Sequence, residues 1–499
     1  MVKKQGRGLG WPRRTGVVLG ALALVTGLAV TPAVAADFTI DESTQEAAQV
    51  GGIGAISNGG TVDSCPTLQS EPRTIEAWYN TDDMDYRGYM DPKNQRPWSF
   101  INKAAQIICG ADQDATIKIG MYFIRAIGTS DRPESDSQMI WNALYWVKKH
   151  RNVKIEFVLD GGGITSASGK ENIKRELEKT GIAKLYWCYN GCFDTNVSSK
   201  FPYAINHEKF VTISDTIWAN KDMKADKNGP KTPAVYSSSG QFARSQVRTY
   251  WQEATLIYGD KKLHDLFDAR FRMMKECSGS TRGNADCRSG KDLKKVAKDM
   301  NLSFSLAKER GIWVDKQYRH GTDAGRGTMV SFSPQDNTVT DYYTSQFGDM
   351  DCTVDKTVRV AMYRLTDTRA PKFIEVMGKL KKAGCDVKVL LSQKGGATTI
   401  SKKVASALKK AKLTDQVRCT AIPIHTKLIL IGPADSNAGR VMMGTANMST
   451  SGLRYSEEHV ITIDSRRITD DKVAEDFREA YGVYLAGWNE LNQGSKACH

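Results

Sequence analysis

Two short stretches decide the fold: residues 205–214, INHEKFVTIS, and residues 424–432, IHTKLILIG. Each carries His-x-Lys near its start and then continues as an apolar run, which is typical of a buried strand. On a strand, residues i and i+2 point to the same face, so each stretch presents one imidazole and one ammonium group side by side. The two stretches indicate that the chain contains a duplicated half.

The neighbouring segments repeat in the same order. Residues 115–124 (ATIKIGMYFI) and 356–365 (KTVRVAMYRL) are β-type runs with Met-Tyr at the same place. Each is followed by a helical pattern and a second strand, and then by another helix and a strand that ends in Cys188 or Cys419. The shared order makes chance similarity of two ordinary segments a poor explanation.

Strands that alternate with helices of about 10–15 residues imply βαβ units in a largely parallel sheet. We therefore predict an α/β fold of two pseudo-symmetric repeats, each a mixed, mostly parallel sheet flanked by helices, with the active site at their interface. The predicted parts are a signal peptide (1–35), an N-terminal segment (36–70), the first half (71–275), a disulfide-tied insertion or linker (276–327), the second half (328–490) and a C-terminal tail (491–499).

Composition excludes several classes of protein. Hydrophobic residues make up 40% of the 499 residues and charged residues 25%, as in ordinary globular proteins. Wholesale disorder, collagen and a multi-span membrane protein do not fit these values.

The first 35 residues have the pattern of a secretory signal peptide. Five basic residues precede a mostly apolar run over residues 16–30, and Ala33-Val34-Ala35 is a small-x-small cleavage site. The alternative is an N-terminal membrane anchor. Cleavage removes five positive charges and changes the formal charge from +14 to +9. We expect a secreted, extracellular protein that is a monomer.

All ten cysteines lie beyond the predicted cleavage site. An even number of cysteines in an exported protein indicates disulfides, although spacing leaves the connectivity open. Cys188–Cys192 and Cys277–Cys287 are the natural local loops. The chain lacks Cys-x-x-Cys and His-x-x-x-His clusters, so we expect no metal site.

The two His-x-Lys motifs suit a phosphodiester substrate if the halves pack about a pseudo-two-fold axis. Two lysines would neutralise the non-bridging oxygens, a neutral histidine would attack phosphorus, and a protonated histidine would give its proton to the leaving oxygen. A single His-x-Lys motif is weak evidence for a catalytic site, because a basic residue often stands two positions after a histidine by chance. Two motifs at matching positions of a repeat, His207/Lys209 and His425/Lys427, are a much stronger signal.

At these residues the chain resembles the phospholipase D superfamily, whose motif is His-x-Lys-x-x-x-x-Asp, followed by Gly-Ser-x-Asn and then Glu. The second half matches with residues 444–447 (GTAN) and Glu458, and the first half, more loosely, with residues 238–241 (SSGQ) and Glu253. The resemblance spans about 410 residues. It implies an enzyme that acts without a cofactor, since lysines supply the charge that Mg²⁺ would otherwise supply.

The resemblance assigns roles by position. His207 and His425 are the implied catalytic pair, with His207 forming a phosphohistidine and His425 protonating the leaving alcohol. Glu253 and Glu458 would orient the imidazoles. The implied phosphate-binding residues are Lys209, Lys427 and Asn447, with Ser239, Gln241 and Thr445 as weaker candidates.

Two departures from the family pattern bear on activity. The motif Asp is replaced by Ser214 and Gly432, and Gln241 stands where the family has Asn. In the family, that Asp is mainly structural, so the resemblance implies that activity is retained in the leading interpretation. The departures leave open a degenerate, non-catalytic phosphate- or cell-surface-binding protein.

The leading interpretation is a secreted phospholipase D-type phosphodiesterase, which hydrolyses phospholipids or transfers the phosphatidyl group to another alcohol. A secreted nuclease with the same chemistry is the alternative, because positive charge favours any polyanion. The chain lacks a basic strip interleaved with aromatic residues, which favours lipid over single-stranded nucleic acid. Residues 221–231 form a polar, basic insertion after the first motif; it is either a solvated loop or a lid that contacts a lipid surface.

Overall fold

The structure is a computed structural model. It describes Cys65 and residues 72–79, 100–124, 136–162, parts of 171–193, 204–243 except 221, 250–278, short pieces of 305–321, 325–335, 340–365 except 349, 369–392, 400–433 and 438–498. The predicted signal peptide lies outside the described residues, as does most of the predicted 276–327 insertion. No helix among the described residues is long and apolar enough to cross a membrane.

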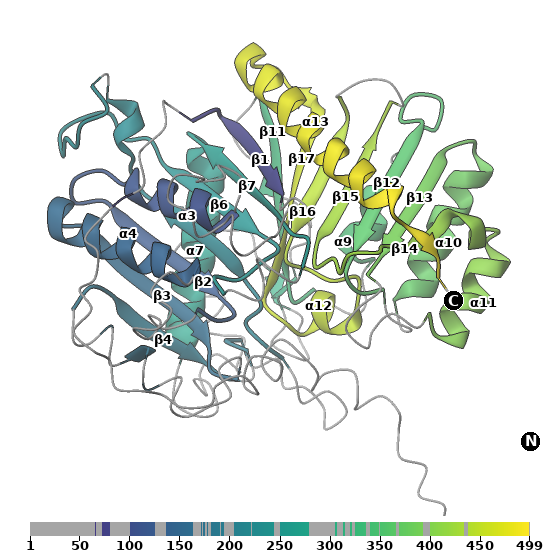
Figure 1. Cartoon of the computed structure of the whole chain (residues 1–499), viewed down its shortest axis with the longest axis horizontal. Helices are drawn as coiled ribbons and strands as arrows, with labels where there is room; N and C mark the ends of the chain where they lie inside the picture. Colours follow the sequence, from purple (N-terminus) through teal and green to yellow (C-terminus); the bar gives the residue numbers. More distant parts are fainter. Residues whose placement is uncertain are drawn as a thin grey trace, which may run out of the picture. The chain divides into compact units, whose positions relative to one another are not determined.

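The first half forms a seven-stranded sheet (Figure 1, purple to teal). Its central strands at residues 209–213, 234–238 and 253–258 consist entirely of buried residues. The strand order is β1 (Ile75–Tyr79), β7 (Glu253–Tyr258), β6 (Ala234–Ser238), β5 (Lys209–Ile213), β2 (Thr116–Met121), β3 (Lys154–Asp160) and β4 (Lys184–Cys188).

The second half repeats this sheet with one extra strand at each edge (Figure 1, green to yellow). The predicted duplication is therefore present in three dimensions, strand for strand. The order is β10 (His320–Gly321), β11 (Arg326–Ser333), β17 (Glu458–Ile468), β16 (Arg440–Gly444), β15 (Lys427–Gly432), β12 (Thr357–Met362), β13 (Asp386–Leu391), β14 (Val417–Cys419) and β18 (Lys496–Ala497).

Each sheet is mixed, as predicted, but the prediction that it is mostly parallel is wrong. Only β2–β3–β4 and β12–β13–β14 pair in parallel, and the other strand pairs of both sheets are antiparallel. A parallel pair needs a crossover, usually a helix, to return the chain to the same edge. Such a helix precedes β3, β13 and β14, whereas no helix lies between β15 and β16 in the described residues, and the segment from β16 to β17 contains only the five-residue helix α12 (Thr450–Arg454).

Helices cover the outer face of each sheet. In the first half α3 (Phe100–Cys109) and α4 (Asp136–Arg151) pack together and contribute to one core with β2 and β3. In the second half that position is taken by α9 (Tyr342–Gln346), α10 (Ala370–Lys382), α11 (Lys402–Lys410) and α12 (Thr450–Arg454).

A third core joins the halves. It contains α7 (Lys261–Cys277), α13 (Asp471–Gln493) and buried residues from both sheets. Helix α7 contacts five strands of the first sheet and β11 of the second, and α13 contacts β1 and β17. Because each helix bridges two sheets, the halves share one hydrophobic interior.

The C-terminal residues are part of the second sheet rather than a tail. Helix α13 continues to Gln493, and β18 pairs with β14. A disulfide between Cys419 and Cys498 covers this edge. The predicted boundary at residue 490 is therefore too early, because the sequence pattern of a two-residue edge strand is too short to recognise.

The disulfide prediction is confirmed for the described cysteines, none of which is free. The predicted Cys188–Cys192 bridge is present, and Cys277 is also disulfide-bonded, although its predicted partner Cys287 lies outside the described residues. The other bridges are Cys65–Cys109, Cys352–Cys385 and Cys419–Cys498.

Candidate active site

The two His-x-Lys motifs enter equivalent strands at the same end. Lys209 begins β5 and pairs with Met121 of β2, while Lys427 begins β15 and pairs with Met362 of β12. The residue after each of these methionines donates its backbone amide to the middle residue of the motif, at 3.0 Å in both halves. The Met-Tyr pair of the repeat is thus the immediate strand neighbour of the motif.

The structure brings the two histidines together. Their ring centroids lie 6.2 Å apart with the ring planes at 70°. Each histidine is held by backbone of the other half: His207 donates its amide to Glu457 O, and His425 donates its amide to Trp251 O, each at 2.9 Å. These acceptors lie just before β17 and β7, so reciprocal backbone bonds build the junction that carries the site.

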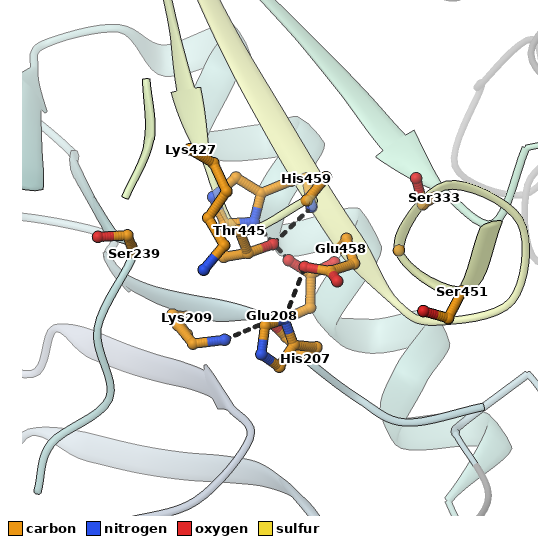
Figure 2. Close-up of polar contacts among 12 residues, drawn as sticks. His207, Glu208, Lys209, Ser239, Ser333, Lys427, Thr445, Ser451, Glu458 and His459 are labelled. Atoms are coloured by element: carbon orange, nitrogen blue, oxygen red, sulfur yellow. Dashed lines mark hydrogen bonds and ion pairs between the residues drawn. The ribbon is translucent and has the colours of Figure 1, made fainter. Parts of the chain in front are cut away.

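His207 has a carboxylate partner from the second half (Figure 2). Its Nδ1 atom lies 2.8 Å from Oε2 of Glu458, and both side chains are nearly inaccessible to solvent. Burial raises the pKa of Glu458 well above its usual range, against the opposing effect of Lys209 and Lys427. When Nδ1 holds the proton that this pair shares, the Nε2 atom keeps its lone pair and is a nucleophile.

His425 has neutral partners in the first half. Its Nδ1 atom lies 3.0 Å from the backbone oxygen of Ser239 and 3.2 Å from Oε1 of Gln252. Lys427 places its Nζ atom 3.1 Å from the same nitrogen. An adjacent ammonium group disfavours a second positive charge at this site.

Glu253 is the counterpart of Glu458 but makes different contacts. Its carboxylate accepts hydrogen bonds from Ser239 Oγ at 2.7 Å and from the Lys427 backbone amide at 3.3 Å. Burial raises its pKa, opposed by these hydrogen bonds and by the Lys427 ammonium group. These contacts connect Glu253 to the loop and strand on either side of His425, so its predicted orienting role remains a prediction.

The two lysines occupy the same place in each half. Lys209 Nζ donates to His207 O at 3.0 Å, and Lys427 Nζ donates to His425 O at 2.6 Å. Both side chains are fully buried. Each ammonium group therefore lies beside the histidine of its own motif, where it can contact a bound anion.

The other predicted phosphate-binding residues, Asn447 and the three weaker candidates, differ in position. Ser239 hydrogen-bonds Glu253, and Thr445 Oγ1 accepts the backbone amide of His459 at 3.0 Å. Gln241 is fully buried. The Oδ1 atom of Asn447 is buried and has no hydrogen-bond partner among the described residues. The proposed phosphate-binding role of all four remains a prediction.

The two positions that lack the motif Asp are accommodated differently. Ser214 Oγ accepts the backbone amide of Thr116 at 2.9 Å, which ties the end of β5 to β2. At Gly432 even a Cβ atom would overlap the backbone oxygen of Ala438. The second half thus has no room for the motif Asp, and its orientation depends on strand pairing.

The 221–231 insertion lies at the other end of β5 from the motif. Asp112 accepts the Asp226 amide at 2.7 Å and the Asn220 side chain at 3.1 Å, and Asp215 pairs with Lys231. Residues 222–228 are exposed. The solvated-loop interpretation is therefore supported, and a lid over the histidines is not.

Sequence reasoning missed three charged residues behind the site. Glu208 pairs with His459 and accepts from Arg270 Nε at 3.0 Å, and all three are buried (Figure 2 shows Glu208 and His459). A signal was present, because Glu208 lies inside the first motif and His459 follows Glu458. Among the described residues no group of three or more His, Cys, Asp or Glu side chains is arranged to hold a metal ion.

Comparison with known families gives one match within the second half. Residues 352–481 match the family model described as "Cardiolipin synthase, PLD-like domain". No curated protein matches the chain in sequence.

Several solved structures are similar to this fold. The phosphatidylserine synthase of Haemophilus influenzae Rd KW20 has a TM-score of 0.50 at 9% identity, covering 87% of this chain and 89% of that one. Nuc, a phospholipase D family member from Salmonella typhimurium, has a TM-score of 0.25 at 17% identity, and the match covers 34% of this chain and 95% of Nuc. Yeast tyrosyl-DNA phosphodiesterase has a TM-score of 0.41 at 10% identity, and the match covers 79% of this chain and 91% of the yeast protein. The first of these shows that the two-lobed arrangement is shared over nearly the whole of both chains.

Proposed function

We propose that this chain is a member of the phospholipase D superfamily and a phosphodiesterase that acts through a phosphohistidine intermediate. The observation that carries the proposal is the pairing of the two histidines with unlike partners. His207 meets the carboxylate of Glu458, whereas His425 meets neutral oxygens and an ammonium group. The two steps of the reaction need two histidines with such different environments.

In the first step His207 is the nucleophile. Its Nε2 lone pair forms a bond to phosphorus while the bond from phosphorus to the leaving oxygen breaks, and protonated His425 gives that oxygen its proton. The attacking imidazole of His207 becomes positively charged, and Glu458 stabilises that charge through Nδ1–H. The products of this step are a free alcohol and a phosphorylated His207.

In the second step neutral His425 takes a proton from water or from a second alcohol. The activated oxygen attacks phosphorus, the bond from phosphorus to Nε2 breaks, and His207 returns to its starting state. Lys209 and Lys427 contact the non-bridging oxygens, whose negative charge is the reason for placing two ammonium groups in a buried site.

We propose a phospholipid as the substrate. The matched family model and the phosphatidylserine synthase carry names of enzymes that make phospholipids. The lack of a basic strip interleaved with aromatic residues supports the same choice. We further propose that the chain is exported, because the described cysteines are all disulfide-bonded and disulfides persist in oxidising compartments.

The test uses the full-length chain expressed with export and purified in EDTA. It is incubated with phosphatidylcholine vesicles and, separately, with plasmid DNA. Release of choline supports the proposal. Release that continues in EDTA supports neutralisation of the phosphate charge by the lysines. Nicking of DNA without choline release would replace the lipid by a nucleic acid as the substrate. Neither activity would favour the phosphate- or surface-binding protein.

A further inference from the structure

A second pair of residues, Glu208 and His459, joins the two halves behind the candidate site. Each is the chain neighbour of one member of the His207–Glu458 pair. Successive side chains of an extended segment point to opposite sides, so the two pairs connect the same junction from its two sides. The backbone between them is bonded as well, because His207 donates to Glu457 O and Glu457 donates to Ile205 O at 3.0 Å.

The second pair is fully buried and fully partnered. Glu208 bonds His459 Nδ1 with one carboxylate oxygen and accepts from Arg270 Nε at 3.0 Å with the other. His459 Nε2 lies 2.7 Å from Ser237 Oγ, and its ring packs on Phe267 with centroids 5.0 Å apart. Burial alone would raise the pKa of Glu208, but His459 and Arg270 outweigh it and the pKa is lowered.

Arg270 anchors this cluster to α7 and to the second half. Its guanidinium group donates to Ser333 O and lies over the rings of Phe193 and Phe332, at 4.7 and 5.2 Å from their centroids. Removing one member of a buried ionic group is costly because the remaining charge is left unpaired. The position of Glu208 is therefore strongly determined.

The equivalent positions around His425 cannot form such a pair. Thr426 stands where Glu208 stands, and Ala254 stands where His459 stands. Ser237 of β6 hydrogen-bonds the His459 ring, and the matching position in β16 is Met443, which has no hydroxyl group. The Glu208–His459 pair therefore lies beside His207 and has no counterpart beside His425, although the backbone around the two histidines is alike.

We propose that Glu208, His459 and Arg270 are positioning residues, which hold Glu458 against His207 and thereby make the two histidines of the repeat unequal. This inference rests on the proposed function. Strand β17 begins at Glu458, so fixing His459 on one side of the strand fixes the direction of Glu458 on the other. None of the three is required to contact the substrate.

The test replaces the pair by the residues of the other half, Glu208→Thr with His459→Ala, in the full chain. This removes both members of the pair together. Arg270 loses its Glu208 partner, and its guanidinium group still donates to Ser333 O. We expect kcat to fall by about 10²-fold with KM nearly unchanged, as for a misplaced reacting group. The acidic limb of the pH–rate profile should move to lower pH. A displaced Glu458 no longer favours the protonated form of His207.

The control is Asp464→Asn, which breaks the buried Arg440–Asp464 pair of the second sheet at 3.2 Å. It should lower Tm while leaving the pH–rate profile unchanged. A double variant that keeps the wild-type profile and kcat would overturn the inference. If the wild-type chain has no phosphodiesterase activity, the proposed function fails, and the imidazole titration of His207 by NMR tests the positioning role separately: an unchanged pKa in the double variant would refute it.

Discussion

The Nδ1 atom of His207 lies 2.8 Å from Oε2 of Glu458, a residue 251 positions further along the chain. The same separation in sequence divides Glu208 from His459. The second half therefore completes the environment of His207, since the histidine comes from one half and its carboxylate from the other. A fragment that contains only one half lacks a partnered nucleophile.

The first prediction separates the roles of the two histidines. With ³²P-labelled substrate, a phosphoprotein should be trapped in His425→Asn, because the nucleophile remains and the second step is slow. No label should appear in His207→Asn, where the covalent bond cannot form. The label should be labile in acid and stable in base, as a phosphoramidate is. The reverse pattern of labelling would exchange the two roles.

The second prediction concerns the two carboxylates. Glu458→Gln should lower kcat by about 10²-fold, since an amide cannot stabilise the imidazolium at His207 as a carboxylate does. Glu253→Gln should cost less, because its contacts run to Ser239 and to the Lys427 backbone. Steady-state kinetics measures both, with the exposed Glu375→Gln as a control. Equal losses at both positions would contradict the unequal pairing.

The third prediction is a pH dependence of stability. Burial raises the pKa of Glu457 to about 8, although Arg270 and the Phe193 amide, at 3.0 Å, oppose the shift. A carboxyl group with a raised folded-state pKa stabilises the fold below its unfolded pKa of about 4.5, and this contribution is lost as pH rises through 8.

Glu457→Gln removes this titration and copies Gln252, the residue at the matching position of the first half. The free energy of unfolding of the variant should exceed that of the wild type increasingly from pH 5 to pH 8, by up to a few kcal/mol, since one pKa unit corresponds to about 1.4 kcal/mol. Urea unfolding across this range measures the difference. A difference that does not vary with pH would contradict the assignment.

The fourth prediction restores the family residue that the second half lacks. Gly432→Asp should lower the free energy of unfolding by at least about 1–3 kcal/mol, because its Cβ overlaps the Ala438 backbone and the added carboxylate is buried. Ser214→Asp, at a half-buried position, is the matched variant and should cost less. Thermal unfolding compares the two, and a more stable Gly432→Asp would contradict the packing argument.

The fifth prediction concerns the insertion after the first motif. Lys224→Ala combined with Lys227→Ala should leave hydrolysis of vesicles within about twofold of wild type, because Asp112 and Asp215 hold this loop at the far end of β5. The loop is exposed, so such surface changes also have little effect on stability. A large loss of activity on vesicles, with normal activity on a soluble ester, would instead support the interpretation of this loop as a lid that contacts the lipid surface.

The sequence by itself determined the duplication, the buried character of the β5 and β15 strands and the side-by-side placement of histidine and lysine in each motif. These are local properties, since period-two patterning places His207 beside Lys209 and His425 beside Lys427 whatever the rest of the fold does. A repeat of the motif then implies that a second copy of the same strand exists, and two like halves pack about a common axis.

Only the tertiary structure decided the strand directions and the partners of the two histidines. Helix–strand alternation predicted parallel pairing, but direction depends on the path of each connection, and the chain returns antiparallel from β5 to β6 to β7 and from β15 to β16 to β17. The partners of His207 depend on how β17 meets the start of β5 across 251 residues, and no local pattern carries that information. Glu208 and His459 read as polar residues at strand ends in the sequence, and their charges become a buried pair only because the packed halves exclude water from both.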